Sequence, residues 1–329
     1  MDLFTHVLFA YLITFGIWGP TYPQYIAAGA LAGALPDADI LLFPLARRFP
    51  LLRHHGITHS VVGVSLIAVG GALLGPHLIP GLNPLYLFLA MEGGGLSHIF
   101  LDAFTNFSVP PLAPFSRWEI HFDADRAVNF ATMIGTLVAF VILLEERGTV
   151  PLRLWETTAW VLLALYIAYL VVRGWGRVVV ERVRRREGYN GVIPSAWPWA
   201  WILVDETIAP DLYRIRWRPY HWGRGFVGPE HELSVPSRAP GEGPVLTEEE
   251  AIRRSFEAAS DRSRFLANSY RFAEARTLPN GFEVFWYSLE FTTWGRAAGI
   301  LARIDSEGGL VELRTAWRAP RALSRGREG

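Results

Sequence analysis

The sequence predicts a polytopic α-helical membrane domain of about six helices, followed by a small soluble α+β domain with an antiparallel sheet. Residues up to about 175 are mostly apolar and carry few, clustered charges, whereas arginine, glutamate and aspartate become frequent from Trp175 on. The formal net charge is zero. That balance gives no reason to expect a polyanionic partner, so nucleic-acid binding is not expected.

Six apolar stretches in the first half are separated by short loops that contain glycine, proline or arginine. They lie at residues 4–18, 25–43, 58–75, 85–105, 127–144 and 155–173. A helix needs roughly 20 residues to cross the hydrocarbon core of a bilayer, so the second, fourth, fifth and sixth stretches are long enough. The first and third are shorter, and we expect them to be tilted or re-entrant.

Arginines between these stretches are distributed unevenly. With six crossings, one side receives Arg47, Arg48, Arg53, Arg117, Arg126, Arg173, Arg177, Arg182, Arg184, Arg185 and Arg186. The other side keeps only Arg147 and Arg153. Because arginine is enriched in cytoplasmic loops, we expect a multi-pass protein of the cell (inner) membrane whose N-terminus and C-terminal domain both lie in the cytoplasm.

These patterns divide the chain into three regions. We expect a transmembrane domain with a metal site at residues 1–175, a basic membrane-proximal linker at 176–189 and a cytoplasmic α+β domain at 190–329. The arginines of the linker are typical of a positive-inside anchor, and recognition of anionic lipid is the functional alternative.

From about residue 190 the pattern changes to the short alternating runs that are typical of strands. Strands are expected at residues 200–204, 212–217, 282–291, 298–304 and 310–317. Thr247 and Glu250 form a capping box that begins a helix, and a second helix is expected over 262–269. A stretch rich in proline and glycine at 226–244 is expected to be a loop.

Histidines and aspartates form five local clusters, and ionisable groups at membrane depth are costly enough to be functional candidates. The clusters are His6, Asp37 with Asp39, His54 to His59, His98 with Asp102, and His121 with Asp123 and Asp125. Each has a plainer interpretation as a structural residue, an interfacial anchor or a partner of a helix dipole. The chain has no cysteine, so any metal would have only nitrogen and oxygen ligands.

Spacing limits the geometry of two clusters. His98 and Asp102 are four residues apart on a predicted helix, so they share one face and can chelate a cation or hydrogen-bond each other. Asp37 and Asp39 follow a proline at a helix end and would point in nearly opposite directions on a continuous helix. We expect one of the two aspartates to be a ligand and the other to orient a ligand or cap the helix.

The arginine distribution, which was read without these residues, places all five clusters on the same side of the membrane. Helix ends far apart in sequence would then deliver imidazoles and carboxylates to one pocket. A set drawn from the aspartate pair, His59, His98 and Asp102 gives mixed nitrogen and oxygen ligation. Such ligation suits a divalent metal, with zinc expected first and manganese or iron as alternatives.

The combined motif order resembles a known family. It reads Thr5-His6, Pro36-Asp37-x-Asp39, His54-x-Gly56-x-Thr58-His59-Ser60 and His98-x-x-x-Asp102-x-x-Thr105. This order is similar to that of the bacterial and archaeal membrane-bound metal-dependent hydrolases, relatives of the inner-membrane YdjM and YfhO proteins. The resemblance covers the membrane half and implies hydrolytic activity. His55 stands where the YdjM-like pattern usually has arginine.

A more distant likeness is to the zinc-dependent phospholipase C and P1 nuclease group. It implies that Asp102 bridges two ions and that His6 joins the second. The last ligand cluster of that group, a His-x-x-x-Glu, is missing from this chain.

Together these observations predict a membrane-bound, metal-dependent hydrolase acting on a lipid-linked phosphoester at the cytoplasmic face. Asp37 and Asp39 are the candidate catalytic residues. The candidate metal ligands are His6, Asp37, Asp39, His54, His59, His98 and Asp102. The alternatives are a metal-ion transporter, with Glu92 as its mid-membrane charge, or a non-catalytic anchor whose tryptophan-rich tail binds a protein partner.

Overall fold

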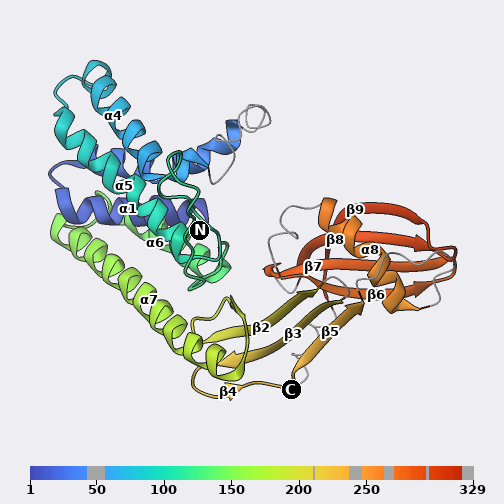
Figure 1. The fold of residues 1–329 in the computed structure, drawn as a ribbon. Coiled ribbons are helices and arrows are strands. Elements are labelled where there is room, and N and C mark those ends of the chain that lie inside the picture. The colour runs from blue at the N-terminus through green and yellow to red at the C-terminus, as the bar shows by residue number, and fades with distance from the viewer. Residues whose placement is uncertain (43–55, 210–211, 237–246, 263–269, 294–295, 321–329) are drawn as a thin grey trace. The chain divides into compact units, whose positions relative to one another are not determined.

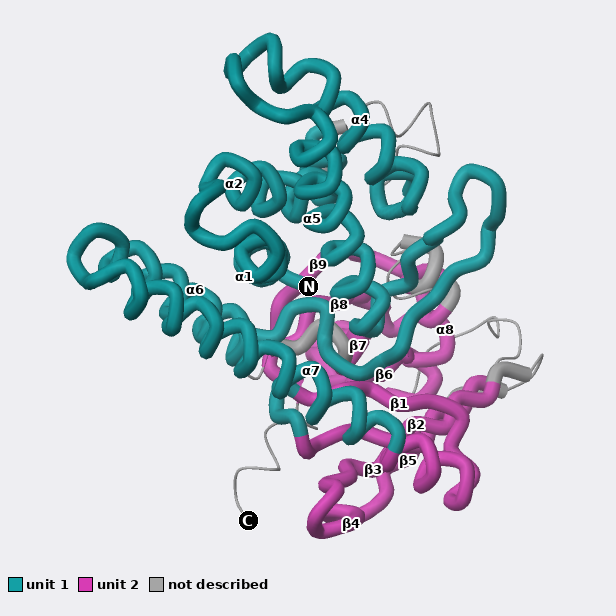
Figure 2. Tube along the Cα trace, turned by 90° about the vertical axis from the view of Figure 1, so that its left-hand side faces the viewer, with its two compact units in different colours: residues 1–178, 196–198 teal, residues 179–195, 199–329 magenta. Residues whose placement is uncertain are grey.

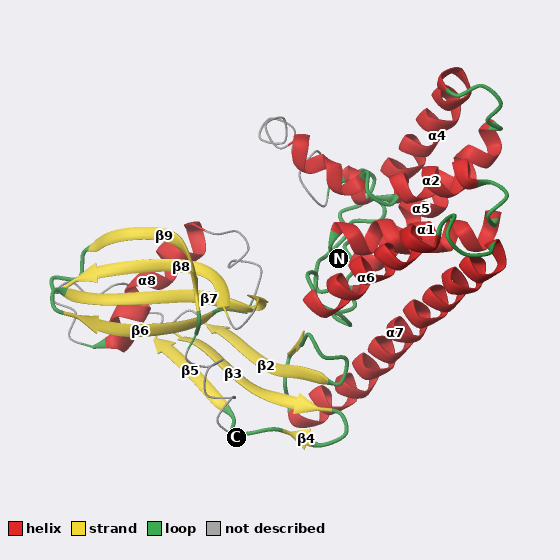
Figure 3. Cartoon of the chain, turned by 180° about the vertical axis from the view of Figure 1, so that it is seen from behind, coloured by secondary structure: helices red, strands yellow, loops and turns green. Residues whose placement is uncertain are grey.

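The computed structural model describes residues 1–42, 56–209, 212–236, 247–262, 270–293 and 296–320 (Figure 1). The chain forms two compact units, which are coloured separately in Figure 2. Unit 1 comprises residues 1–178 with 196–198, and unit 2 comprises residues 179–195 with 199–329. Unit 1 is built mainly from helices and unit 2 mainly from strands (Figure 3).

Unit 1 is built from apolar helices. They are α1 (Leu3–Trp18), α2 (Pro23–Ala32), η1 (Pro36–Leu42), η3 (Ile57–His59), α4 (Val61–Leu78), α5 (Pro84–Phe104), α6 (Phe130–Glu146) and α7 (Leu152–Glu187), the last of which continues into unit 2. A longer connection, residues 105–129, joins α5 to α6. Asp2, Ser60 and Asn83 begin α1, α4 and α5, and the side chain of each accepts a hydrogen bond from a backbone N–H of the first turn. These caps satisfy N–H groups that a helix leaves without a partner.

The prediction of about six membrane crossings is wrong. In the described part of the chain, two helices are long and apolar enough to cross a membrane: Val61–Leu78 and Leu152–Glu187. The first of them corresponds to the third apolar stretch, which we expected to be tilted or re-entrant. The second, fourth and fifth stretches, which we expected to cross, do not form such helices.

Helix ends explain the difference. The second stretch is divided because α2 stops at the Gly33 cap after 10 residues, and the chain resumes as the 3₁₀ helix η1 at Pro36; proline does not fit inside an α-helix because it lacks the N–H and clashes with the preceding turn. Helix α6 has 17 residues. Helix α5 is longer, but Glu92, His98 and Asp102 lower its hydropathy.

Glycines allow the first helices of unit 1 to approach α5 closely. A Cβ atom on Gly94 would lie 2.0 Å from the carbonyl oxygen of Gly29, so the backbones of α5 and α2 are in contact there. A Cβ on Gly63 would lie 2.0 Å from the carbonyl oxygen of Ile57, so η3 folds directly onto the start of α4. Only glycine permits such approach. Helices α2 and α4 both pack against α5.

A buried ion pair ties the loop after α5 to α7. Arg173 donates to Asp125 Oδ1 at 2.6 Å, and neither side chain is exposed. Asn129 and the backbone N–H of Arg126 donate to the same oxygen. Arg173, one of the arginines that we expect on the cytoplasmic side, therefore also has a packing role inside unit 1.

Unit 2 contains two antiparallel sheets and one helix. The first sheet is formed by β1 (Gly191–Pro194), β2 (Ala200–Ala209), β3 (Leu212–His221), β4 (Gly225–Phe226) and β5 (His231–Pro236), in the order β1-β2-β3-β4, with β5 also paired to β3. The second is a meander of β6 (Phe272–Leu278), β7 (Gly281–Thr293), β8 (Arg296–Asp305) and β9 (Leu310–Arg318). Helix α8 (Glu248–Arg262) follows the predicted capping box.

The antiparallel strands of the C-terminal region are therefore confirmed, with two sheets in place of one. One hydrophobic core joins both sheets and α8. Trp201 and Trp286 are buried, while Trp197 and Trp199 are exposed. Strand β5 lies in the stretch that we expected to be a loop. Of the predicted second helix at 262–269, Arg262 ends α8 and residues 263–269 lie outside the described residues.

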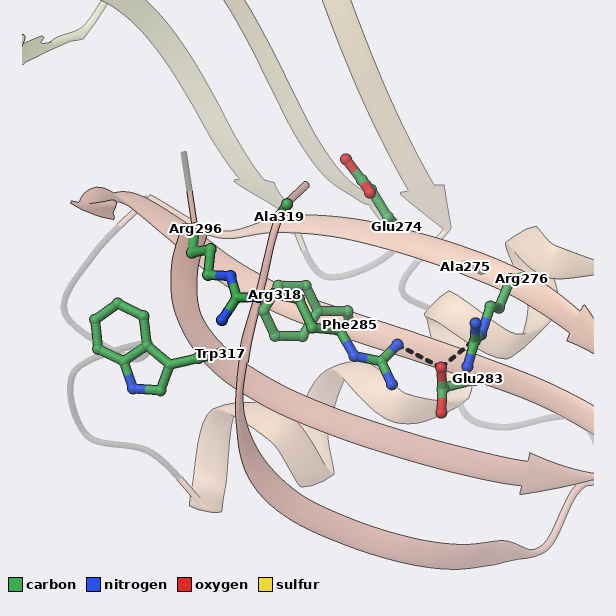
Figure 4. Close-up of a pocket in the computed structure, with 9 residues that line it drawn as sticks. All are labelled: Glu274, Ala275, Arg276, Glu283, Phe285, Arg296, Trp317, Arg318 and Ala319. Atoms are coloured by element: carbon green, nitrogen blue, oxygen red, sulfur yellow. Dashed lines mark hydrogen bonds and ion pairs between the residues drawn. The ribbon is translucent and has the colours of Figure 1, made fainter. Parts of the chain in front are cut away.

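Glu283 is a buried carboxylate on the second sheet of unit 2. It lies opposite Arg276 of β6 and Arg303 of β8 in the strand register, and it accepts hydrogen bonds from Arg303 and Arg318 while forming an ion pair with Arg276. Glu283, Arg276 and Arg318 line a hollow of about 400 Å³ together with Trp317 and Phe285. Figure 4 shows these five side chains. Burial raises the pKa of Glu283, but the three arginines outweigh burial and lower the pKa from 4.5 to about 2.

We predict that Glu283 makes the stability of unit 2 dependent on pH in acid. Because the pKa is lower in the folded state, the stabilisation is complete above about pH 4.5 and is lost as the pH falls to about 2. At pH 7, Glu283→Gln should destabilise the protein by about 1–3 kcal/mol, and this difference from wild type should shrink below pH 4.5. Thermal unfolding of the full chain in detergent measures both.

The control is Glu312→Gln, since Glu312 pairs with Arg303 and Arg314 at the more exposed edge of the same sheet. Its effect should stay within about 0.5 kcal/mol. A Glu283→Gln defect of the same size at pH 7 and pH 3 would contradict the assignment of this carboxylate.

Candidate metal centre

Four ionisable side chains from three separate elements meet inside unit 1. Asp37 comes from η1, His59 from the end of η3, and His98 and Asp102 from α5. One ligand atom from each lies within 4.8 Å of all the others. They meet because η1 follows α2 and η3 precedes α4, and both of those helices pack against α5. We refer to these four residues as the metal centre.

The spacing within the metal centre fits a small cation. Asp102 Oδ2 lies 3.2 Å from His98 Nε2 and 3.6 Å from His59 Nε2. Asp37 Oδ1 lies 3.5 Å from His59 Nε2 and 3.7 Å from His98 Nε2. Ligands at about 2.0–2.1 Å from a tetrahedral zinc ion lie about 3.3 Å from one another. Two imidazoles and two carboxylates at these separations could hold one divalent ion after small movements.

His98 is oriented to present one nitrogen to the metal centre. Its Nδ1 lies 2.8 Å from the carbonyl oxygen of Gly33. A carbonyl only accepts, so Nδ1 carries a proton and Nε2 is the nitrogen that faces the metal centre. That Nε2 atom is buried and makes no hydrogen bond. Metal-binding histidines usually donate their other N–H to a carbonyl or carboxylate in this way, so His98 fits the role of a ligand.

His59 is held from behind by Asp39. Its Nδ1 lies 3.4 Å from Asp39 Oδ2 and 3.1 Å from the hydroxyl of Thr58, which itself donates to Asp39 at 2.6 Å. The side chain of Asp39 is fully buried. Because residues two apart in a 3₁₀ helix diverge by about 120°, Asp37 reaches Nε2 of His59 while Asp39 reaches Nδ1. One aspartate faces the metal centre and the other orients its histidine.

The charges around His59 create a field that favours a cation. Burial lowers the pKa of His59, but its hydrogen bonds with Asp37 and Asp39 and the charge of Asp102 outweigh burial and raise the pKa to about 9. Burial raises the pKa of Asp37, but the hydrogen bond with His59 and the charges of His98 and His6 outweigh burial and lower this pKa below its usual value. The negative charge of these carboxylates favours a proton on His59, and for the same reason it favours a divalent cation.

His6 of α1 extends the cluster on the far side of Asp102. Its ring stacks on that of His98 with 3.7 Å between ring centroids, and its Nε2 lies 3.1 Å from Asp102 Oδ1. Neither ring nitrogen of His6 makes a hydrogen bond, although both are buried. The Met1 amino group also contacts Asp102 Oδ1. Asp102 thus directs one oxygen to the metal centre and the other to His6.

His121, Asp123 and Asp125 are not part of this group. His54, a predicted ligand, and His55 lie outside the described residues. His121 is exposed and pairs with Asp123 at 3.0 Å, and Asp125 is committed to the buried pair with Arg173. Sequence reasoning missed the Gly33 carbonyl, because a backbone group leaves no signal in residue type.

The comparisons with known proteins identify a family. The YdjM inner membrane protein family matches residues 1–179, which is more than half of the chain. Comparison with curated proteins and comparison with solved structures both found no match. The distant likeness to phospholipase C and P1 nuclease is therefore not supported.

We predict that the purified protein binds a divalent metal at this centre. His98→Ala and Asp102→Ala should each remove a ligand and abolish stoichiometric binding. Asp39→Asn should weaken the affinity for the metal by about 10–100-fold, because Asp39 orients the ligand His59 and does not bind the ion itself. Elemental analysis and competition titration with a chelator measure the two effects.

His77→Ala is the matched control, since His77 is an exposed histidine near the end of α4. It should bind metal as the wild type does. Equal metal content in the wild type, His98→Ala and Asp102→Ala would exclude this centre as the binding site.

Proposed function

This chain belongs to the YdjM inner membrane protein family, and on that premise we propose that it is a membrane-bound, metal-dependent hydrolase of a lipid-linked phosphoester. The observation that supports the proposal is the convergence of two buried imidazoles and two carboxylates on one point. A divalent ion held there would polarise a phosphoryl oxygen and make water a better nucleophile near neutral pH.

The four residues of the metal centre differ in their access to solvent, and this difference suggests separate roles. The side chains of His59 and His98 are fully buried and that of Asp102 is 3% exposed, whereas that of Asp37 is 23% exposed. We assign the three buried residues to holding the ion. Asp37 marks the side from which a substrate arrives.

Asp37 is also the better placed of the two candidate catalytic aspartates. Its carboxylate is partly exposed and is kept ionised by the lowered pKa, so it can accept a proton from an attacking water or complete the ligand set. Asp39 is sealed behind His59 and cannot reach water or substrate. We therefore assign Asp39 to positioning His59.

The donor set also guides the choice of ion. Two imidazoles with two carboxylates suit zinc, and manganese or iron would fit if further oxygen ligands joined. We propose zinc as the first candidate. His6 is available as an additional nitrogen donor on the other oxygen of Asp102.

The family and the distribution of arginines support a placement of the metal centre relative to the membrane. We propose that the metal centre and unit 2 lie on the cytoplasmic side, because arginines gather in the loop after α5 and at the end of α7. A site at a membrane face meets lipid headgroups more often than soluble metabolites, which is why a lipid phosphoester is the proposed substrate.

The test is hydrolysis in lipid nanodiscs. With zinc or manganese supplied, the wild type should release the headgroup of a phosphodiester lipid that carries a fluorescent headgroup, and a chelator should stop release. Asp37→Asn should lower kcat by about 10²–10⁴-fold if it acts as a general base, while His77→Ala leaves the rate unchanged.

Two outcomes would overturn the proposal. Turnover that survives in both His98→Ala and Asp102→Ala would show that the metal centre is not the catalyst. Metal flux into proteoliposomes without any hydrolysis would favour transport, for which the partly buried Ser65–Glu92 hydrogen bond between α4 and α5 is the place to mutate.

A further inference from the structure

The loop between α5 and α6 exposes a group of large apolar side chains. Between residues 110 and 122, which we call the aromatic loop, Phe115 is 86% exposed, Trp118 58%, Phe122 54% and Leu112 48%. These side chains lie outside any helix, so helix packing does not account for their exposure. Exposed apolar patches of this kind mark sites of interaction.

The aromatic loop has a defined conformation. Its two ends are joined by a pair of backbone hydrogen bonds between Val109 and Ile120, at 3.0 and 2.9 Å. At its tip, the N–H groups of Phe115 and Ser116 both donate to the carbonyl oxygen of Leu112. Val109 is fully buried beneath the loop. The exposed side chains are therefore held outward by the backbone and cannot simply fold inward.

The same loop is attached directly beside the metal centre. The N–H of Val61, two residues after His59, donates to the carbonyl oxygen of Pro111 at 3.0 Å. The N–H of Phe122 donates to the carbonyl oxygen of Ala103, the residue after Asp102, at 2.8 Å. The loop is thus hydrogen-bonded to backbone groups next to two residues of the metal centre, His59 and Asp102.

These attachments also locate the loop relative to the bilayer. Val61 is the first residue of α4, which is one of the two helices long and apolar enough to cross a membrane. The start of a spanning helix lies at a membrane face, so a loop bonded to Val61 lies at that face. Trp118 and Arg117 are both exposed there, and tryptophan and arginine are favoured at the boundary between lipid and water.

We propose that the aromatic loop inserts into the headgroup layer of the bilayer and sets the metal centre at the depth of the lipid phosphates. The occupant of this surface is lipid, because the loop is hydrogen-bonded to the first residue of a helix that is long and apolar enough to cross a membrane, and because it combines aromatic rings with a cation. Insertion itself is independent of hydrolysis. Its consequence, that substrate enters from the leaflet, rests on the proposed function.

The test uses single-cysteine variants, which need no background changes because the chain has no cysteine. Phe115→Cys and Trp118→Cys are labelled with an environment-sensitive fluorophore and placed in nanodiscs that contain nitroxide lipids. We expect a blue-shifted emission that is quenched more by a nitroxide near the headgroup than by one at mid-chain. An interfacial segment buries its apolar face by only about 5–10 Å.

Two matched positions calibrate the measurement. Val69→Cys, at an exposed site in the middle of α4, should be quenched most by the mid-chain nitroxide. Val311→Cys, an exposed valine on β9, should be quenched by iodide in water and not by lipid. Metal content equal to that of the wild type shows that each variant is folded.

The loop labels decide between three outcomes. Lipid quenching supports the proposal. Iodide quenching equal to that of Val311→Cys would overturn it in favour of a solvent-exposed loop, and protection from both quenchers would overturn it in favour of a protein partner. None of these results requires turnover, so they stand apart from the fate of the proposed hydrolysis.

A kinetic experiment tests the consequence. The double variant Phe115→Ser with Trp118→Ser should raise KM for a lipid in the bilayer by about tenfold or more, because each lost ring removes apolar surface that the bilayer would bury. Its kcat, and its rate on a water-soluble short-chain phosphoester, should match the wild type. An equal loss on both substrates would contradict delivery from the leaflet.

Discussion

Burial of the Asp102 carboxylate is the constraint around which unit 1 is arranged. A carboxylate removed from water is costly unless opposite charge or hydrogen bonds surround it. Asp102 lies near the end of α5, and His98, His59 and His6 approach it from three elements. Helix α5 can receive them because Gly94 admits the backbone of α2, and because Gly63 of α4 admits η3. The described elements before residue 60 thus pack around one side chain.

The same arrangement explains what the sequence could and could not reveal about the site. Asp37, His59, His98 and Asp102 were predictable as a group, because ionisable residues in apolar surroundings are rare and the arginine distribution put them on one face. The sequence predicted that one of the two aspartates faces the metal centre and the other orients a ligand, but not which one. The 3₁₀ conformation of η1 decides this, because it turns Asp37 to Nε2 and Asp39 to Nδ1 of His59.

The error in the number of crossings has a related cause. Hydropathy averaged along the sequence predicts one continuous apolar segment at 25–43, but Gly33 and Pro36 divide it into the ten-residue helix α2 and the 3₁₀ helix η1. That division is what carries Asp37 and Asp39 to the metal centre. In unit 2, strands with buried alternating residues such as β7 and β8 were predictable, whereas the two-residue strand β4 carries too little pattern to be recognised.

Depth in the membrane connects these features. His59 and Val61 lie two residues apart, so the metal centre and the start of α4 share a level in the structure, and the aromatic loop is bonded to that same level. In the proposed function, substrate enters on the side of Asp37, because that side chain is partly exposed while those of His59, His98 and Asp102 are buried. At a membrane face, a headgroup can take that path without its acyl chains leaving the lipid. Short helices that end inside the unit, which made the crossings hard to predict, are therefore what allow polar chemistry to sit beside lipid.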